Sequence, residues 1–204
     1  MTDTTENRSR SGARSLAQIA VFAGVIAAMG LVPAFTPPGS SVPITIQSMG
    51  VMLAGAILGA RKGFASVLLV LALVAIGLPL IAGGRGGLGI FTTPSVGFFI
   101  GFPFAALIIG WLTERKGAPY RVVLGSVFNL VGGIVFLYIL GIGGIMLRTG
   151  ISLPAAFAAV AIFIPGDVIK AIVAAIIAKP VHMAYPGLLP DRRPAAELEH
   201  VEVS

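Results

Sequence analysis

The sequence contains no cysteine and only two histidines, His182 and His200. The lack of cysteine excludes a disulfide framework, a thiolate metal site and a cysteine nucleophile. Because both histidines lie near or in the C-terminal tail, we expect no zinc or haem site and no other cofactor. Charged residues make up only 11% of the 204 residues, whereas soluble domains carry about 25%. These absences exclude an ordinary soluble domain.

Apolar residues take the place of the missing charges, at 56% of the chain with a mean hydropathy of +0.99. This composition is typical of an all-α membrane protein that crosses the bilayer several times. The net charge of +6 would suggest nucleic-acid binding in a soluble protein. Here the basic residues stand at the ends of apolar segments, as the positive-inside rule predicts, so we expect a bilayer and no nucleic acid as the partner.

Six long apolar segments are separated by polar or glycine-rich stretches, and we expect each to form a transmembrane helix. The expected helices are Leu16–Val32, Ile44–Ala60, Phe64–Ala82, Ser95–Leu112, Tyr120–Leu140 and Pro165–His182. A glycine-rich loop is expected at Gly141–Gly150, followed by a short helix at Leu153–Ile162. Residues 1–14 and 185–204 are polar and are expected to be disordered tails around a six-helix domain of residues 15–184.

The lysine and arginine residues predict the orientation. If the N-terminus is inside, eleven of the fourteen fall in inside segments, Arg85 and Arg148 fall in outside loops, and Lys170 lies in a span. This asymmetry satisfies the positive-inside rule with both termini in the cytoplasm. We therefore expect a multi-pass protein of the inner or plasma membrane.

The segment Phe163–Lys170 places two opposite charges inside an apolar stretch. Asp167 and Lys170 are three residues apart, so on a helix they share one face. Ionisable residues at membrane depth are costly and usually face a cavity, which makes this pair a candidate functional site. The pair could also be structural, with the two charges only neutralising each other.

The expected topology brings other polar residues to the same outer side as Asp167 and Lys170. These residues are Thr45 and Gln47 at the start of the second helix and Arg85 in the glycine-rich stretch after the third. An outward-facing pocket follows, in which Asp167 would accept N–H groups of a neutral ring and Lys170 or Arg85 would pair with a carboxylate. Of the two, Lys170 is preferred, because a helix defines its position better than a loop defines that of Arg85. The expected ligand is small, amphiphilic and anionic.

Several motifs bear on enzymes and nucleotide binding. Residues 84–89 match the G-x-G-x-x-G pattern, but the dinucleotide fingerprint needs a preceding strand, and this stretch follows an expected membrane helix. The sequence has no Gly-Lys-Ser/Thr Walker motif. It also shows no nucleophile–base pair, so we do not expect an enzyme.

Three stretches together resemble one membrane-protein family: Pro43–Gln47, the Gly83–Phe98 loop with its Thr-Pro, and Phe163–Lys170. They are similar to the BioY family, the biotin-binding substrate-specific (S) components of energy-coupling factor (ECF) transporters. The resemblance covers about residues 16–182. It implies a six-helix membrane protein that binds biotin from outside.

The resemblance also implies residue roles and partners. Asp167 and Lys170 would contact biotin. Small residues of the first helix, here Ala23 and Ala27, would dock the energy-coupling membrane subunit. An ATPase pair would supply the energy, although some members of the family are thought to act without these partners.

One part of the chain departs from the family pattern. Residues 93–98 read Thr-Pro-Ser-Val-Gly-Phe where the family commonly reads Gly-Pro-Thr-Gly-Gly-Tyr. Pro94, Gly97 and the aromatic Phe98 remain and are included among the candidate binding residues. The missing tyrosine hydroxyl would remove one ligand hydrogen bond, worth about 1 kcal/mol, if the family makes it.

Other interpretations stay open. The chain could be an S component for another small vitamin, which ligand competition would separate. It could also be a membrane interaction protein that transports nothing and whose Asp167–Lys170 pair is structural. No ligand would then bind, and reversing both charges together would restore folding. An intramembrane enzyme is the least expected, since the chain offers one charged pair and no nucleophile.

Overall fold

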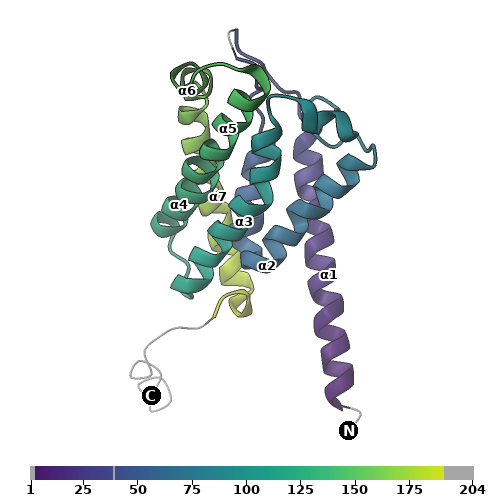
Figure 1. The fold of residues 1–204 in the computed structure, drawn as a ribbon. Helices are drawn as coiled ribbons and strands as arrows, with labels where there is room; N and C mark the ends of the chain where they lie inside the picture. Colours follow the sequence, from purple (N-terminus) through teal and green to yellow (C-terminus); the bar gives the residue numbers. More distant parts are fainter. Residues whose placement is uncertain (1–2, 39, 191–204) are drawn as a thin grey trace.

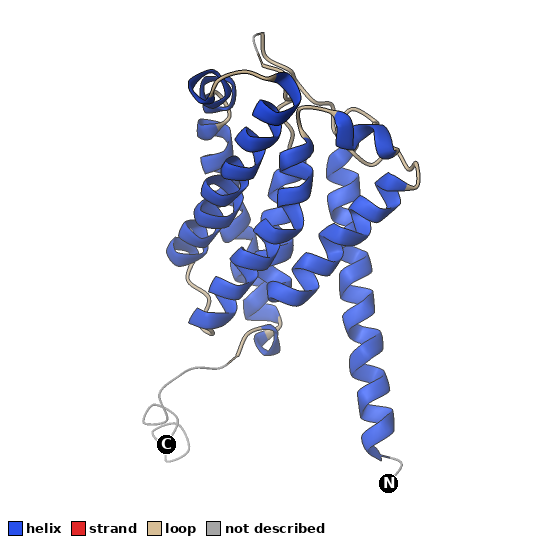
Figure 2. Cartoon of the chain, viewed as in Figure 1, coloured by secondary structure: helices blue, strands red, loops and turns tan. Residues whose placement is uncertain are grey.

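The structure is a computed structural model that describes residues 3–38 and 40–190. Apart from loops and two isolated β-bridges, this described part is helical (Figure 2). The α-helices are α1 (Asp3–Gly30), α2 (Gln47–Ala75), α3 (Val96–Lys116), α4 (Val122–Leu130), α5 (Leu137–Thr149), α6 (Leu153–Ala161) and α7 (Ile164–Ala184). Shorter segments are the 3-10 helix η1 (Leu88–Thr92), the π-helix η2 (Val131–Phe136) and the 3-10 helix η3 (Pro186–Leu188). The all-α prediction is confirmed.

The helices form a bundle with α3 near its centre (Figure 1). α2 and α5 pack on α3, and α7 packs on α4 and α2. The N-terminus of α1 and η3 lie at one end of the bundle, which we call the α1 end (Figure 1). η1, α6 and the loops that precede α2 and α3 lie at the opposite end, which we call the loop end (Figure 1).

Four helical stretches of the described chain are long and apolar enough to cross a membrane. They are Gly12–Gly30 of α1, α2, α3 and the continuous helix Val122–Thr149 formed by α4, η2 and α5. α6 and α7 together give a fifth candidate span that is bent by 55°. α2 itself consists of two arms, 47–58 and 60–75, that meet at Gly59. Counting these arms separately gives six apolar segments, which is the predicted number.

The break in α2 depends on three residues. Gly59 has a φ of 81°, a left-handed conformation that favours glycine. The backbone N of Ala60 donates to Glu114 Oε1 at 3.0 Å, which satisfies an N–H group at the start of the second arm. Gly110 of α3 lets the two backbones approach so closely that a side chain there would overlap residue 60. The sequence predicted a turn at Arg61 and Lys62, and the structure places the break two residues earlier, at Gly59.

The predicted loop at Gly141–Gly150 is wrong, because α5 continues to Thr149. Two of its glycines lie against α3. A Cβ on Gly141 would overlap the ring of Phe98, and a Cβ on Gly144 would lie 2.5 Å from the backbone N of Gly97. In membrane helices, glycine allows this close approach of a second helix. These glycines are packing residues, although their spacing suggested a loop.

Three other predicted boundaries differ from the structure. α2 ends at Ala75 instead of residue 82, because Gly77 has a φ of 112° and Pro79 follows it. α1 begins at Asp3, so residues 3–14, predicted as a disordered tail, extend the first helix. These residues contain no proline, and adding a residue to an existing helix is easier than nucleating one. At the C-terminus, η3 begins the predicted tail, and residues 191–204 lie outside the described residues.

Candidate ligand pocket

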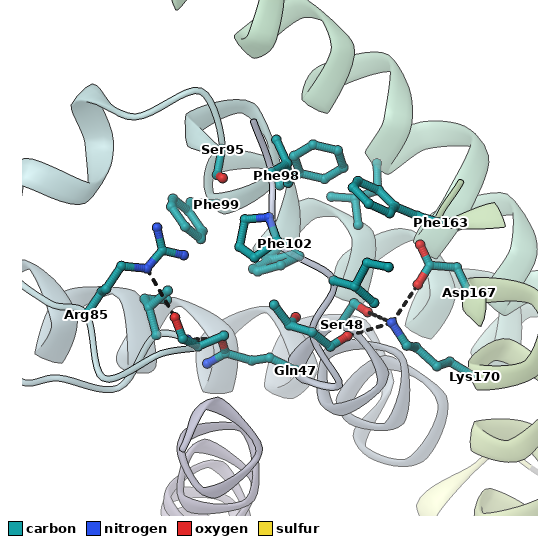
Figure 3. Close-up of a pocket in the computed structure, with 17 residues that line it drawn as sticks. Gln47, Ser48, Arg85, Ser95, Phe98, Phe99, Phe102, Phe163, Asp167 and Lys170 are labelled. Carbon is teal, nitrogen blue, oxygen red and sulfur yellow. Dashed lines mark hydrogen bonds and ion pairs between the residues drawn. The ribbon is translucent and has the colours of Figure 1, made fainter. Parts of the chain in front are cut away.

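A pocket opens at the loop end, between the start of α2, the loop at residues 81–85, the start of α3 and the start of α7 (Figure 3). Its empty space, including the open mouth, is about 560 Å³. Aromatic side chains form much of the wall: Phe98, Phe99, Phe102 and Phe163. The charged lining residues are Arg85, Asp167 and Lys170, so the pocket carries one net positive charge and suits an anionic ligand.

The predicted pair of charges is formed. Asp167 and Lys170 lie one turn apart near the start of α7, and Lys170 Nζ donates to Asp167 Oδ1 at 2.8 Å. Lys170 Nζ also donates to the backbone O of Thr45 at 2.5 Å and to Ser48 Oγ at 3.4 Å. The pair thus ties α7 to the start of α2. An ammonium group has three N–H donors, and the long contact to Ser48 is the one that a ligand could replace most easily.

Asp167 is held in place by the start of its helix and by two donors. α7 carries Pro165 in its first turn, where the missing N–H costs little. Asp167 lies in the same turn, where the helix dipole favours a negative charge. Asp167 is only 8% exposed, and two donors compensate its burial. Lys170 donates to Oδ1, and the hydroxyl of Tyr138 donates to Oδ2 at 2.6 Å. Each oxygen keeps further acceptor capacity for a ligand N–H.

Tyr138 is a site residue that the sequence analysis missed. It lies 29 positions before Asp167, inside an apolar run that gives no local signal of function. Its ring packs edge-on against Phe98, with the ring centroids 6.0 Å apart. A single tyrosine in such a run is equally compatible with simple packing, so only the tertiary contact identifies it.

Gln47 lines the pocket, but the protein itself occupies its amide group. Nε2 donates to the backbone O of Leu80 at 2.8 Å and to that of Ile26 at 3.3 Å. Oε1 accepts from the backbone N of Ala82 at 3.3 Å, and the residue is 2% exposed. Gln47 therefore joins α1, α2 and the loop after α2, and it shapes the pocket wall.

The remaining predicted pocket residues fall into two groups. Thr45, Arg85 and Phe98 line the pocket. Pro94 and Gly97 are not among its lining residues. Gly97 lies at the contact of α3 with α5, where a Cβ would overlap a backbone carbonyl oxygen of α5. Gly97 therefore has a packing contact with α5 in this structure.

The predicted docking residues on α1 differ in exposure. Ala23 is 4% exposed and belongs to the core of this chain, so it is not available to a partner in this structure. Ala27 is half-buried, whereas Gly24 and Ala28 are exposed. The accessible small residues on this part of α1 are therefore Gly24 and Ala28.

Membrane-length helices around a pocket with a partly buried ion pair define a membrane protein that binds a small polar ligand. The same fold occurs in a crystal structure of the S-component for biotin from an ECF-type ABC transporter. The TM-score is 0.82 and the sequence identity 31%, with 85% of this chain and 93% of that chain covered.

The family model of the BioY family matches residues 2–187, and the chain belongs to this family. The biotin transporter BioY of Rhizobium etli is 48% identical over 184 residues, covering 88% of this chain and 98% of the relative. The biotin transporter BioY of Rhodobacter capsulatus is 47% identical over 185 residues, covering 86% and 97%. The family predicted from three sequence stretches is confirmed. The chain is a multi-pass membrane protein from a family of transporters.

Proposed function

We propose that this protein is the S component for biotin of an ECF-type transporter, which captures biotin in the pocket and delivers it to the cytoplasm. The observation that carries this proposal is the position of Asp167 and Arg85 on opposite sides of the pocket, with aromatic side chains between them (Figure 3). Biotin carries its groups in the matching order. It has a urea with N–H donors, an apolar ring system, and a carboxylate at the end of a hydrocarbon chain.

The urea binds at the Asp167 side of the pocket. Asp167 accepts an N–H group of the urea through the acceptor capacity that Lys170 and Tyr138 leave. Lys170 turns the N–H of its long contact with Ser48 toward the urea oxygen. A charged donor and a charged acceptor together favour a urea over rings that lack this donor–acceptor pattern.

The carboxylate of biotin binds to Arg85. Arg85 Nε donates to the backbone O of Ala82 at 3.1 Å, which positions the guanidinium group and directs both Nη groups elsewhere. Lys170 is a weaker candidate for this role, because Asp167 and the carbonyl of Thr45 already engage it at short distances. A guanidinium group also matches a carboxylate with two parallel hydrogen bonds.

Titration calorimetry of the purified protein in detergent tests the proposal, with desthiobiotin and riboflavin as competitors. We expect one saturable biotin site that desthiobiotin blocks and riboflavin does not. Folded protein that binds no biotin would contradict the proposal. Displacement of biotin by riboflavin would favour an S component for another vitamin.

Arg85→Ala is expected to weaken biotin binding about 10- to 100-fold, because a hydrogen bond to a charged group contributes about 1.5–3 kcal/mol. The same substitution should lower the affinity for biotin methyl ester, which lacks the carboxylate, by less than about threefold. Arg148→Ala is the matched control, since Arg148 is exposed and donates to the backbone O of Phe91. Equal losses for the acid and the ester would show that Arg85 does not bind the carboxylate. Calorimetry measures the affinity of each protein for the acid and for the ester.

We further propose that the pocket faces outside and that both termini lie in the cytoplasm. The distribution of basic residues supports this orientation. Arg61, Lys62, Arg115, Lys116 and Lys179 belong to the segments that the positive-inside rule assigns to the cytoplasm. A pocket on the outer side is accessible to a vitamin before uptake.

Partner subunits drive the proposed uptake, because the sequence contains no Walker motif. The partners are a coupling membrane subunit and an ATPase pair. Docking of the coupling subunit uses the exposed residues Gly24 and Ala28 of α1. Small residues four apart on a membrane helix allow a second helix to pack closely.

Gly24→Leu is expected to abolish co-purification with the coupling subunit and to leave biotin affinity unchanged, because the new side chain separates the helices. Gly143→Leu is the matched control, because Gly143 is an exposed helical glycine on α5, and a Cβ added there would meet no atom within 4 Å. Affinity purification from co-expressing cells measures the assembly. An intact complex with Gly24→Leu would exclude this docking face.

A further inference from the structure

α4, η2 and α5 form one continuous helix that makes two side-chain hydrogen bonds to α7. Asn129 Nδ2 donates to the backbone O of Ala171 at 2.9 Å, and the Tyr138 hydroxyl donates to Asp167 Oδ2 at 2.6 Å. The two receiving residues lie one turn apart on α7. Asn129 and Tyr138, however, are nine positions apart on their own helix.

A regular α-helix would not allow both contacts. At about 100° per residue, nine positions turn the chain by about 900°, which places the two side chains on opposite faces. Asn129 and Tyr138 would then point about 180° apart, and only one of them could face α7.

The π-helical segment η2 lies between these two residues and removes the conflict. A π-helix has about 4.4 residues per turn, so its six residues turn the chain by about 490° where an α-helix would turn it by about 600°. The total rotation from Asn129 to Tyr138 falls to about 790°, and the two side chains point within about 70° of each other.

We propose that Tyr138, rotated toward α7 by η2, is the positioning residue for Asp167. This inference rests on the proposed function for its role in biotin binding. Tyr138 is 6% exposed and does not line the pocket, so it acts through Asp167 and not on the ligand. With Lys170 on Oδ1 and Tyr138 on Oδ2, both oxygens of the carboxylate are held from two different helices. The carboxylate is thereby pre-oriented for the ligand N–H, and this reduces the ordering that binding requires.

Tyr138→Phe tests this role at the level of affinity. We expect biotin to bind about tenfold more weakly, because the Asp167 carboxylate must then be ordered when biotin binds. Biotin methyl ester should weaken by the same factor, because Tyr138 acts at the urea side and not at the carboxylate. Tyr120→Phe is the matched control, since the hydroxyl of Tyr120 is buried without a hydrogen-bond partner within the described chain. Unchanged biotin affinity in Tyr138→Phe would overturn the inference.

A thermal unfolding cycle tests the contact without any ligand. If Tyr138 acts through Asp167, Tyr138→Phe lowers the Tm of the wild type but causes no further loss in the Asp167→Ala background. Equal losses in both backgrounds would overturn the inference. Should the wild type bind no biotin, the proposed function fails by itself. The unfolding cycle still decides whether Tyr138 positions Asp167.

Discussion

Asp167→Asn is expected to weaken biotin binding at least about a hundredfold, equivalent to about 2.8 kcal/mol. The substitution replaces the proposed charged acceptor of the urea by a neutral amide. It also leaves the ammonium of Lys170, which donates to Asp167 Oδ1 at 2.8 Å, without its counter-charge. An unpaired charge in a poorly solvated site is costly, so the loss should exceed that of one hydrogen bond. Lys170→Ala should be as severe, because it also removes the contact with Thr45.

Calorimetry in detergent measures these affinities, and thermal unfolding shows whether each variant is folded. Glu114→Gln is the matched control, because it makes the same acid-to-amide change on α3, beside the break in α2 at Gly59 and outside the pocket lining. It should lower stability slightly and leave biotin affinity intact. A folded Asp167→Asn protein with an affinity within about threefold of the wild type would remove Asp167 from the binding site.

Reversing both charges of Asp167 and Lys170 distinguishes a ligand-binding pair from a purely structural one. If the charges only stabilise the bundle, the double reversal Asp167→Lys with Lys170→Asp restores the folding that a single reversal impairs. In that case neither the wild type nor any variant binds biotin. If the pocket binds biotin, the double reversal can fold but cannot bind, because the ammonium and the carboxylate then face the wrong groups of the urea. A biotin titration of the folded double variant distinguishes the two cases.

Gly97→Ala is expected to destabilise the protein by about 3 kcal/mol or more. A Cβ at Gly97 would overlap the backbone O of Leu140 and lie 3.1 Å from the Cα of Gly141. Backbone atoms cannot move aside as a flexible side chain can, so α3 and α5 must separate. Thermal unfolding in detergent should show a lower Tm and a smaller folded fraction.

Gly143→Ala provides the control for Gly97→Ala. Gly143 lies on the exposed side of α5, and a Cβ added there would meet no atom within 4 Å. Its replacement should leave the Tm unchanged or raise it, because alanine is favoured over glycine in helices by about 1 kcal/mol. A Gly97→Ala protein that is fully stable but does not bind biotin would instead restore the sequence-based prediction that Gly97 contacts the ligand.

The helices themselves were largely predictable, because membrane spans depend on local composition. α6 and α7 begin and end within two residues of their predicted bounds. The main error inside the membrane-spanning part concerns glycine. The stretch Gly141–Gly150 contains four glycines and was predicted as a loop, yet α5 continues to Thr149 and packs those at 141 and 144 against α3. A glycine can either end a helix or allow a second helix to pack closely against it. The neighbouring residues in the sequence do not show which of these two roles it has.

The candidate pocket was predictable in part. Asp167 and Lys170 share a face because three positions on a helix bring side chains together. Gln47 was assigned to the ligand, but its amide is held by the backbone of Leu80 and Ala82. Both partners lie more than thirty positions away, so no local pattern could show that the amide is already occupied.

By itself, the sequence determined the apolar spans, the bias of basic residues toward one side and the charged pair of α7. Each of these follows from composition or from a spacing of a few residues. Only the tertiary structure decided that Arg85 faces Asp167 across the pocket and that Tyr138 holds its carboxylate. The contact of Tyr138 with Asp167 joins residues 29 positions apart and depends on the rotation that η2 introduces. A change of helical phase leaves the composition untouched, and it becomes visible only when the helices are packed.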